Sequence, residues 1–484
     1  MADIQHVVVL MLENRSFDCM LGRLYPNDPG YKGLTLNEMN VCSGTSFGVW
    51  NSWGMGPTTI CIPDPDPGED FIDMNLQLFG VMDRADATGP ATMCGFAQSY
   101  ANKSQAGASD PAAVMHYFTP DQVPVISTLA RSFGVCDQWY ASAPCQTWPN
   151  RFFAHTGTSL GYVDNDSFPI PFKAPSLFGL LNEANKSWRV YFHDMPQSLL
   201  LRDVWSSALT HYRFFGQFLA DAHAGALPNY SFIEPRYFTD LFKRFIPNDQ
   251  HPPHDVVYGE QLIAAVYNAV RSSPCWKQTL LIITYDEHGG CYDHVSPPAA
   301  TPPDGVVANP YKFNFDFYGV RVPAVIVSPY IPAGSKIQPP TTPGGPNWPF
   351  DHTSIIKTVR EVFNLGAQLT QRDAAAPSLS SALSLPTPAN LGPPSIDPGV
   401  AQPPVAQVAA RGVAAPNGMQ ATLAAAAAAL PASAPATAGE IPNSAVPARI
   451  SYPTVAIAAA HATTGVSQFL GIESPTVPWR ADSS

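Results

Sequence analysis

Two adjacent carboxylates, Asp286 and Glu287, are the strongest chemical signal in the sequence. They follow the apolar run at residues 280–283 and precede His288 and two glycines. Such a run is typical of a strand buried on both faces, and ligands of open α/β sheets bind just past the carboxyl ends of strands. Adjacent carboxylates repel each other unless a cation or a proton offsets their charge. The pattern predicts a metal site, and a polar strand exit with a glycine turn is the alternative.

A second polar cluster repeats this arrangement near the N-terminus. The apolar run at residues 6–12 leads directly into Glu13 and Asn14, which are followed by Arg15 and Ser16. Carboxylate and amide oxygens are suitable ligands for hard cations. Asn14 or Ser16 could also cap a helix that begins here, and the two roles are compatible.

Hydroxyl groups are concentrated in a third segment, residues 147–161. The sequence Thr-Trp-Pro-Asn-Arg at 147–151 is followed by a stretch rich in hydroxyls and glycine, which contains Thr156 and Thr158. A hydroxyl at a helix N-terminus can act as a nucleophile, because free backbone N–H groups and the helix dipole favour negative charge there. An ordinary Thr or Ser cap explains the same pattern without catalysis.

Histidines occur in two further polar segments. His251 and His254 lie with two aspartates in a proline-broken loop at residues 248–255. There they could bind a metal, contact phosphate or act as a general acid. Asp351 and His352 precede a predicted helix, which Asp351 could simply cap.

Residues 28–75 are rich in Gly, Pro, Asn, Ser and Trp, and they are predicted to form a long loop insertion. The acidic run at residues 64–70 could bind calcium, although acids separated by prolines are more typical of a solvated turn. Trp50 and Trp53 could touch lipid or a substrate headgroup, and packing of the loop on the core explains them equally well.

The elements that must position these clusters are predicted from the apolar patterns. Further strands are predicted at residues 188–192, 230–234 and 322–328, and helices at 110–133, at 256–272 and after residue 353. The repeated order of strand, polar cluster and helix predicts an α/β fold with a doubly wound, mostly parallel sheet sandwiched by helices. The polar clusters are expected to meet at one edge of this sheet.

The composition changes near residue 386. Residues 1–385 are predicted to form the catalytic domain, and residues 386–484 form an extension dominated by Pro, Ala, Gly and Ser. We expect a flexible or extended segment that packs loosely on the domain. Residues 448–472 are the part most able to dock on the domain as an ordered segment.

Charge and hydropathy limit the partners of the chain. The 484 residues carry a net charge of -12, which argues against nucleic acid because phosphate contacts need a basic surface. A phosphorylated substrate stays compatible, since one bound cation reverses the local field. No stretch has the roughly 18 apolar residues needed to span a bilayer, and the first residues lack the pattern of a signal peptide.

Taken in order, the motifs resemble those of the phosphoesterase family, which contains non-specific phospholipases C and acid phosphatases on an alkaline-phosphatase-like fold. The resemblance covers about residues 6–365. It is carried by Glu-Asn-Arg-Ser-Phe-Asp at 13–18, Pro-Asn-Arg at 149–151 with Thr-Ser at 158–159, Tyr-Asp-Glu-His-Gly-Gly-Cys-Tyr-Asp-His at 285–294, Gly-Val-Arg-Val-Pro at 319–323 and Phe-Asp-His-Thr-Ser at 350–354. The ordered set is far more specific than any single motif.

The resemblance implies a site that uses one or more divalent metal ions, such as Ca, Mg, Mn or Zn. The implied metal ligands are Glu13, Asn14, Asp286, Glu287 and Thr158. Thr158 is also the implied nucleophile, with Thr156 as its rival. The implied roles in holding phosphate or protonating the leaving group fall to His251, His254 and His352, and the implied substrate contacts are Arg151, His155, His288 and Asp351.

The resemblance implies phospholipase C-type hydrolysis of a phosphoric ester through a phospho-threonine intermediate. Acid phosphatase action on monoesters at the same site is the alternative, and a non-catalytic surface or binding protein is less favoured. A phospholipid substrate would entail peripheral membrane contact, and the family implies a secreted or periplasmic location. Two positions depart from the family pattern: Leu160 stands where the plant phospholipases carry a histidine, and Glu69 stands where a histidine is expected after Asp-Pro-Gly.

Overall fold

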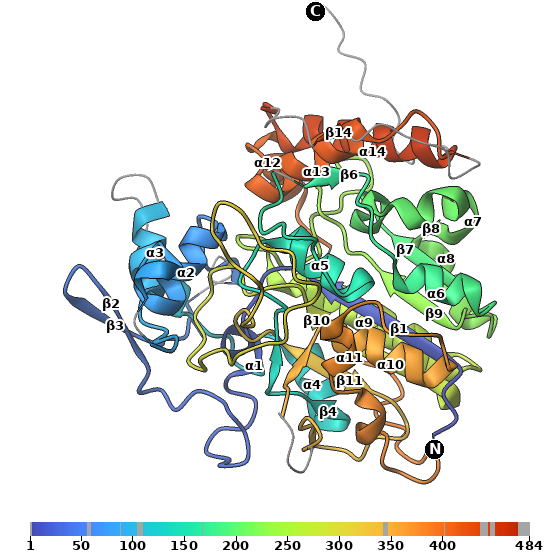
Figure 1. The fold of residues 1–484 in the computed structure, drawn as a ribbon, viewed down its shortest axis with the longest axis horizontal. Coiled ribbons are helices and arrows are strands. Elements are labelled where there is room, and N and C mark those ends of the chain that lie inside the picture. The colour runs from blue at the N-terminus through green and yellow to red at the C-terminus, as the bar shows by residue number, and fades with distance from the viewer. Residues whose placement is uncertain are drawn as a thin grey trace, which may run out of the picture.

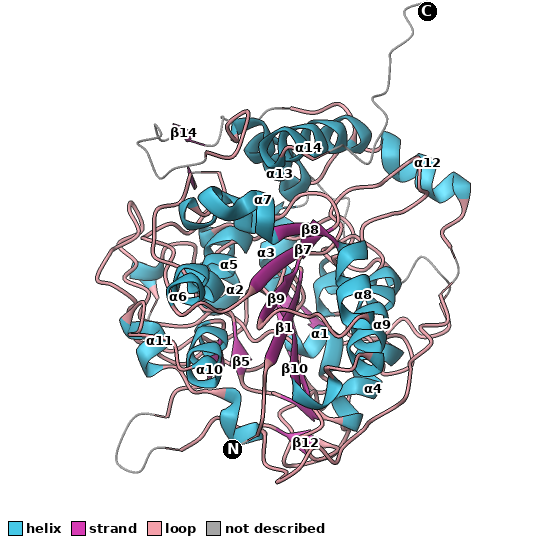
Figure 2. Cartoon of the chain, turned by 90° about the vertical axis from the view of Figure 1, so that its right-hand side faces the viewer, coloured by secondary structure: helices cyan, strands magenta, loops and turns pink. Residues whose placement is uncertain are grey.

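An eight-stranded sheet forms the centre of the computed structural model, which describes residues 2–55, 60–87, 89–103, 110–166, 168–341, 347–400, 402–435, 444–445 and 451–472. The sheet is drawn in Figures 1 and 2. In spatial order its strands are β12 (Ser335–Lys336), β4 (Gly134–Val135), β11 (Ala324–Val327), β10 (Thr279–Tyr285), β1 (His6–Leu12), β9 (Tyr230–Ile233), β7 (Trp188–Phe192) and β8 (Tyr212–Phe214).

The sheet is mostly parallel, as predicted. β1 lies between β10 and β9 and is parallel to both. β11 is the exception, because it runs antiparallel to β10 and to β4. The predicted bounds of β1 and β7 are confirmed, β9 is one residue shorter than predicted, and β11 begins only after Pro323, which has no N–H to donate to a neighbouring strand.

Helices cover both faces of the sheet, as Figure 2 shows. One layer contains α5 (Thr147–Thr156), α6 (Leu177–Glu183) and α10 (Thr353–Phe363), and the other contains α4 (Pro124–Ser132), α8 (Phe215–His223) and α9 (Val256–Ser272). Shorter or peripheral helices are α1 (Phe17–Leu21), α2 (Phe71–Phe79), α3 (Phe96–Lys103), α7 (Ala208–His211) and α11 (Gln371–Ala375).

One helix prediction is confirmed and another is wrong in part. The helix predicted at 256–272 is confirmed as α9, with Asp255 as its N-cap. The helix predicted at 110–133 is wrong in part, because only a 3-10 turn at Pro111–Met115 and then α4 form there. Pro120 and Pro124 disfavour helical backbone at the residues before them, so α4 can begin only at Pro124.

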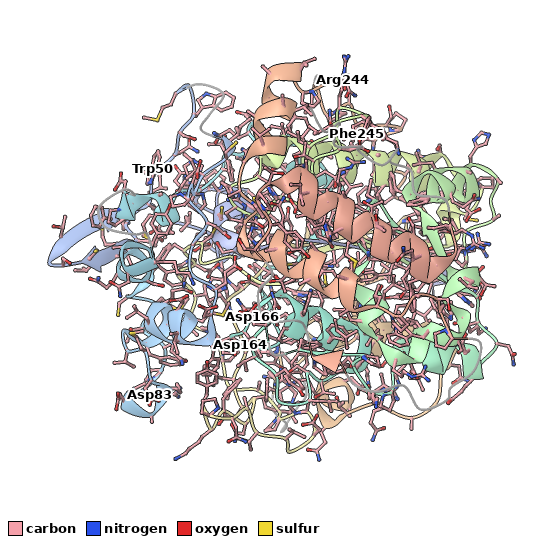
Figure 3. All side chains as sticks on the ribbon, turned by 90° about the horizontal axis from the view of Figure 1, so that it is seen from above. Trp50, Asp83, Asp164, Asp166, Arg244 and Phe245 are labelled. Atoms are coloured by element: carbon pink, nitrogen blue, oxygen red, sulfur yellow. The ribbon has the colours of Figure 1, made fainter. Side chains whose placement is uncertain are left out.

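The insertion at residues 28–75 contains more structure than a loop. A hairpin of β2 (Met39–Cys42) and β3 (Thr45–Gly48) forms within it, and α2 begins at its end. Residues 56–59 lie outside the described residues. Trp50 of this insertion, labelled in Figure 3, packs on His116 with ring centroids 4.9 Å apart. Trp53 is 61% exposed, so packing explains only the first tryptophan.

The C-terminal extension has no helix or strand at residues 386–400 and becomes helical from residue 405, so the expectation of a loosely packed, extended segment is wrong for its helical part. It contains α12 (Val405–Val413), α13 (Gly418–Ala429) and α14 (Val455–Leu470), drawn in orange and red at the top of Figure 1. α13 and α14 pack closely because their contact is made of small residues: a Cβ on Gly465 would lie 2.3 Å from the Ala427 carbonyl oxygen.

The extension also contacts the domain. Phe469 of α14 packs on Trp205 at 5.3 Å between ring centroids, which agrees with the expectation that this part docks as an ordered segment. Residues 446–450 and 473–484 lie outside the described residues. Across the described ranges, the helices are all too short or too polar to cross a membrane.

Candidate functional site

Glu13 and Asp286 lie side by side because the strands that precede them pair in register. β1 and β10 are parallel neighbours, with Leu12 opposite Tyr285. Asp286 donates its backbone N–H to the Leu12 carbonyl at 3.2 Å. Both carboxylates are fully buried at the carboxyl edge of the sheet. The polar clusters that follow β1 and β10 therefore meet at this edge, as the sequence predicts.

Asn14 joins the two clusters through both its backbone and its side chain. Its backbone N–H donates to Asp286 Oδ1 at 3.1 Å, and the Glu287 N–H donates to the same oxygen at 2.8 Å. Its side-chain Nδ2 donates to Glu69 Oε1 at 2.8 Å. Its φ of 46° lies in the left-handed region, which is costly for a residue with a side chain and is typical of functional sites.

The two glycines after His288 allow three loops to come together. Gly289 has a φ of 60°, and a Cβ there would lie 2.3 Å from the Asn14 carbonyl oxygen. A Cβ on Gly290 would lie 2.6 Å from the Pro67 side chain. The close approach of the loops around Asn14 and Pro67 thus depends on the absence of side chains at both positions.

Replacing Gly289 with alanine is expected to lower the free energy of unfolding by roughly 1–3 kcal/mol for the left-handed backbone, and by more for the clash with Asn14. Gly305→Ala is the matched control, because Gly305 also has a positive φ, 78°, but no atom within 4 Å of its added Cβ. Urea unfolding of both variants measures the difference. Equal losses would show that the contact with Asn14 is not tight.

Arg151 holds the carboxylates of this edge in place. It projects from α5, is buried, and contacts Glu13 Oε1 at 2.6 Å through Nη2, Asp286 Oδ2 at 3.2 Å through Nε and Glu234 Oε2 at 3.2 Å through Nη1. Its Nη2 also donates to the Met11 carbonyl at 3.1 Å. The guanidinium thus supports the carboxylates from within the protein, which differs from the phosphate contact implied by the resemblance.

Thr147 is the hydroxyl that the structure brings to the carboxylates. It is the first residue of α5, and its Oγ1 donates to Asn14 Oδ1 at 3.4 Å. It stands at the positive end of the α5 dipole, which favours negative charge at this point, although the Trp148 N–H already donates to Asn165 Oδ1 at 2.9 Å and Pro149 has no N–H. Sequence reasoning missed this residue, although Pro149 was a signal: proline is tolerated only in the first turn of a helix, so the helix had to begin just before it.

The structure does not bring Thr158 and Thr156 to the carboxylates. They lie at the opposite end of α5, a helix of 10 residues, at roughly 15 Å from its start. Thr158 Oγ1 donates to Asp304, and Thr156 Oγ1 donates to the Phe152 carbonyl at 2.9 Å. Both hydroxyls are therefore engaged by other groups of the protein.

His155 lies at that same far end, inside an aromatic cluster. Its ring packs against Phe232 at 4.6 Å and Phe178 at 5.2 Å between centroids. Burial, and then the nearby Arg151, lower the pKa of His155 to about 3. A neutral imidazole enclosed by apolar rings is placed for packing and not for contact with phosphate.

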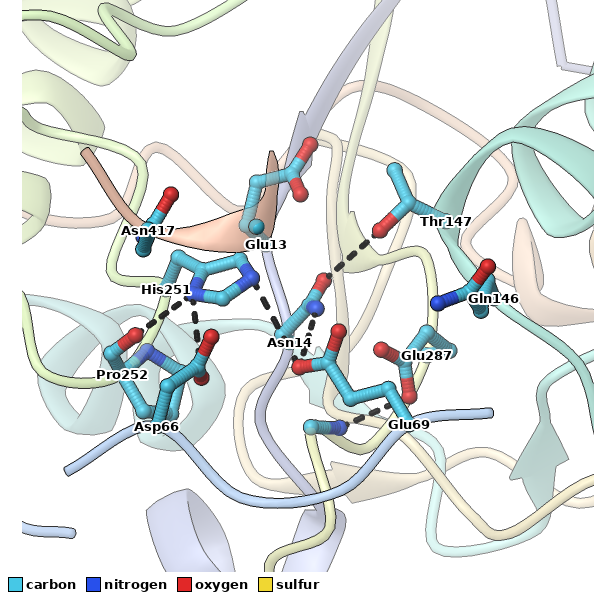
Figure 4. A network of polar contacts seen from close by, with 12 residues as sticks. Glu13, Asn14, Asp66, Glu69, Gln146, Thr147, His251, Pro252, Glu287 and Asn417 are labelled. Carbon is cyan, nitrogen blue, oxygen red and sulfur yellow. Dashed lines mark hydrogen bonds and ion pairs between the residues drawn. The ribbon is translucent and has the colours of Figure 1, made fainter. Parts of the chain in front are cut away.

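His251 faces two carboxylates of the insertion, as Figure 4 shows. Its Nε2 lies 3.5 Å from Glu69 Oε1, and its Nδ1 lies 3.6 Å from Asp66 Oδ1. Burial lowers the pKa of His251, but the carboxylates of Asp66 and Glu69 outweigh burial and raise it well above the usual range. The acidic run of the insertion therefore contributes two side chains to the site instead of a solvated turn.

His254 is oriented by Asp249, whose Oδ1 lies 2.7 Å from His254 Nδ1. The two histidine rings of this loop, those of His251 and His254, are 6.1 Å apart. The other nitrogen of His254, Nε2, lies 3.5 Å from Nε2 of Gln420, which belongs to α13 of the extension. The helical extension thus reaches the loop that carries both predicted histidines.

His352 hydrogen-bonds to the backbone of Asp286. Its Nε2 lies 2.5 Å from the Asp286 carbonyl oxygen, and its Nδ1 accepts from Trp139 Nε1 at 3.3 Å. An indole can only donate and a carbonyl can only accept, so the proton of His352 is fixed on Nε2. Burial lowers the pKa of His352 to about 4. Both nitrogens are occupied by the protein, so His352 is a positioning residue.

The side chains of His288 and Asp351 also bond to other residues of the protein interior. His288 Nε2 lies 2.7 Å from Gln77 Oε1, and burial lowers its pKa to about 3. Asp351 accepts from the hydroxyls of Ser142 at 2.8 Å and Thr353 at 2.6 Å. Neither side chain is open to a substrate, so the structure does not bring these two to the substrate side.

The buried oxygens at the edge of the sheet suit a hard divalent cation. We call Glu13, Asn14, Thr147, Asp286 and Glu287 the carboxyl-edge site. Burial raises the pKa of Glu13 and Glu287 well above the usual range, and neighbouring carboxylates add to the effect. Among the described residues, Glu13 Oε2 and Glu287 Oε1 have no hydrogen-bond donor. A bound cation would satisfy these orphaned oxygens and offset the like charges.

An open pocket lies elsewhere. It has a volume of about 400 Å³ and is lined by residues such as Phe215, Arg236 and Val466, between the ends of β7 and β8 and the helix α14. No residue of the carboxyl-edge site lines it. We therefore assign the chemistry from the side-chain geometry and not from the pocket volume.

The chain is similar to several known proteins. Non-specific phospholipase C1 of Arabidopsis thaliana is 39% identical over 385 residues, which cover 77% of this chain and 69% of that protein. Phospholipase C A of Mycobacterium tuberculosis is 28% identical over 81% of this chain and 79% of its own. The solved phosphonate monoester hydrolase of Agrobacterium radiobacter covers 78% of this chain and 77% of its own, with a TM-score of 0.34 and 11% identity, too low to carry an argument.

A family model also matches most of the chain. The sequence model of the phosphoesterase family covers residues 4–366, which include all five residues of the carboxyl-edge site. The extension that contains α12, α13 and α14 lies beyond this match. With the relatives above, this match shows that the chain is a phosphoric ester hydrolase that belongs to the phosphoesterase family.

Proposed function

We propose that this chain is a metal-dependent hydrolase of the phospholipase C type, with Thr147 as its nucleophile. The observation that carries this proposal is the position of Thr147 Oγ1, 3.4 Å from Asn14 Oδ1 at the N-terminus of α5. A hydroxyl beside a set of buried carboxylates and an amide oxygen is the arrangement that phosphoryl transfer needs.

A divalent ion held by the carboxyl-edge site would neutralise the charge of the phosphate and lower the pKa of the Thr147 hydroxyl. Thr147 Oγ1 attacks phosphorus, its proton is released to solvent, and the bond from phosphorus to the leaving alcohol breaks. The product of this step is a phospho-threonine that still carries the second substituent of a diester. Water then attacks phosphorus and restores the Thr147 hydroxyl. The N-terminus of α5 stabilises negative charge throughout.

We assign the proton transfers to His254. Its Nδ1 faces Asp249 at 2.7 Å, which orients the ring. Proton exchange with the leaving alcohol and then with water would use Nε2, which must first give up its 3.5 Å contact with the Gln420 amide. Burial lowers the pKa of His254, whereas Asp249 opposes this effect. Such an aspartate–histidine pair is a common way to orient a general acid and base.

A phosphodiester lipid is the substrate class that the relatives support, because the curated proteins are named phospholipases C. Acid phosphatase action on monoesters would use the same nucleophile and is not favoured by those names. For membrane contact we propose the insertion, where Trp53 is 61% exposed and Met55 is 67% exposed. Exposed aromatic and apolar side chains of this kind suit the interface of a bilayer.

Parallel hydrolysis of p-nitrophenylphosphocholine and p-nitrophenyl phosphate, with and without chelator, tests the proposal. We expect faster release of p-nitrophenol from the choline diester, and loss of turnover by at least about 10²-fold after chelation, with recovery on adding a divalent ion. Faster hydrolysis of the monoester would move the assignment to a phosphatase. Full turnover in chelator would show that the reaction does not need a metal ion.

A further inference from the structure

Asp66, Glu69 and His251 form a compact cluster beside the carboxyl-edge site. One ligand atom from each residue lies within 4.8 Å of the others. The three residues come from the insertion and from the loop before α9. Figure 4 shows His251 and Asp66 on the side of Asn14 opposite Thr147, with the Glu69 carboxylate next to Asn14. Asp66 and Glu69 are partly buried, and His251 is fully buried.

The hydrogen bonds of His251 define where its lone pair points. Nδ1 lies 2.6 Å from the Pro252 carbonyl oxygen, which can only accept, so Nδ1 carries the proton. In the neutral ring, Nε2 therefore presents a lone pair toward Glu69 Oε1 at 3.5 Å. Two acceptors that face each other require either a second proton on the ring or a cation between them. A metal-ligating histidine usually donates its other N–H to a carbonyl in this way.

Three buried atoms of this region lack a hydrogen bond within the described residues: His251 Nε2, Asp66 Oδ1 and Glu287 Oε1. Metal–ligand bonds to nitrogen and carboxylate oxygen are about 2.0–2.2 Å long, so two ligand atoms of one ion lie up to about 4.4 Å apart. The separation of 3.5 Å between His251 Nε2 and Glu69 Oε1 fits this range.

A second cluster of two aspartates and a histidine shows what a satisfied arrangement looks like. Asp18, Asp293 and His294 also lie within 4.8 Å of one another. There Arg321 contacts Asp18 at 2.9 Å and Asp293 at 3.0 Å, so the positive charge of its guanidinium already balances the carboxylates. No arginine or lysine contact of this kind is found for Glu69 or Asp66 among the described residues.

We propose that Asp66, Glu69 and His251 bind a second divalent cation next to the ion of the carboxyl-edge site. Asn14 links the two sites, because its Oδ1 faces Thr147 while its Nδ2 donates to Glu69 at 2.8 Å. The inference rests on the proposed function for its catalytic meaning. In two-metal phosphoesterases the ions lie roughly 3.5–4 Å apart and stabilise the attacking and leaving oxygens. Glu69, which departs from the family pattern, then provides the carboxylate of this second site.

The test loads the full-length, metal-free chain with Mn²⁺ alone and counts the bound ions. We expect about two Mn²⁺ per chain, and an electron paramagnetic resonance spectrum of two exchange-coupled ions, because the ions are within roughly 4 Å of each other. Glu69→Gln keeps an acceptor for Asn14 but removes the charge, and Asp66→Asn removes the other carboxylate. Each should reduce the content to about one ion with an uncoupled spectrum. His294→Asn, in the cluster balanced by Arg321, should leave about two.

One uncoupled Mn²⁺ in the wild-type chain would overturn the proposal and would assign a second proton to His251 instead. Unchanged metal content in both Glu69→Gln and Asp66→Asn, with circular dichroism showing folded protein, would overturn it as well. These readouts do not depend on turnover. A chain that binds two ions but hydrolyses neither test substrate would refute the proposed function and leave the second site intact.

Discussion

Replacing Thr147 with alanine is expected to reduce the turnover of p-nitrophenylphosphocholine on the order of 10⁴-fold or more, as expected for the loss of a covalent nucleophile. The physical reason is the position of Oγ1 beside Asn14, at the N-terminus of α5. The alanine variant should still fold, because alanine is well tolerated in the first turn of a helix. Acid quenching followed by mass spectrometry should show a phosphocholine adduct on the peptide that contains Thr147 in the wild type.

Thr158→Ala is the matched control, because it removes the same hydroxyl group at the opposite end of the same helix. It should retain turnover to within about tenfold, since its Oγ1 donates to Asp304 and accepts from the Leu160 N–H at 2.9 Å, far from the carboxyl-edge site. Thr147→Ser should keep part of the activity because it restores an oxygen at the same position. Full activity in Thr147→Ala, or an adduct on Thr158, would return the nucleophile to the residue that the motif comparison suggested.

Arg151→Met is expected to lower the free energy of unfolding by about 3–5 kcal/mol when measured in chelator, because it removes the partner of several buried carboxylates. Glu13, Glu234 and Asp286 each contact the guanidinium. The loss should shrink as the pH falls, because protonated carboxyls no longer need a positive partner. Urea unfolding at two pH values measures both effects.

The control for this prediction is Arg189→Met. Arg189 pairs with Asp221, but its side chain is 34% exposed, so water compensates for the lost contact. Exposed pairs of this kind are worth about 0–1 kcal/mol. A similar, small loss in both variants would mean that the carboxylates around Arg151 are neutralised by protons rather than held as charges.

Local patterns in the sequence were sufficient for the scaffold and for the carboxylates. The runs before Glu13 and Asp286 are continuous and apolar, so both strands and their shared edge could be predicted. The extension was predicted less well. Its alanines gave no clear apolar pattern, yet small side chains allow α13 and α14 to approach closely and bury their contact.

The roles of single residues depended on distant contacts and were harder to predict. His352 looks the same in sequence whether it meets a substrate or, as here, lies between Trp139 and the backbone of Asp286. Glu69 reaches the site only because the insertion folds back on Asn14. Thr147 is the exception, because Pro149 marked the start of its helix and could have identified it.

The contacts of the extension have a consequence for the order in which the protein is synthesised. By residue 287 the ribosome has synthesised β1, β9 and β10, the proposed nucleophile and the proposed metal ligands, yet the loop with His254 is still uncovered at that time. Gln420, which lies 3.5 Å from His254 Nε2, and Arg411, which donates to the Pro253 carbonyl at 3.3 Å, arrive only more than 120 residues later. The newly made domain therefore acquires its metal ligands first and the cover of its histidine loop last.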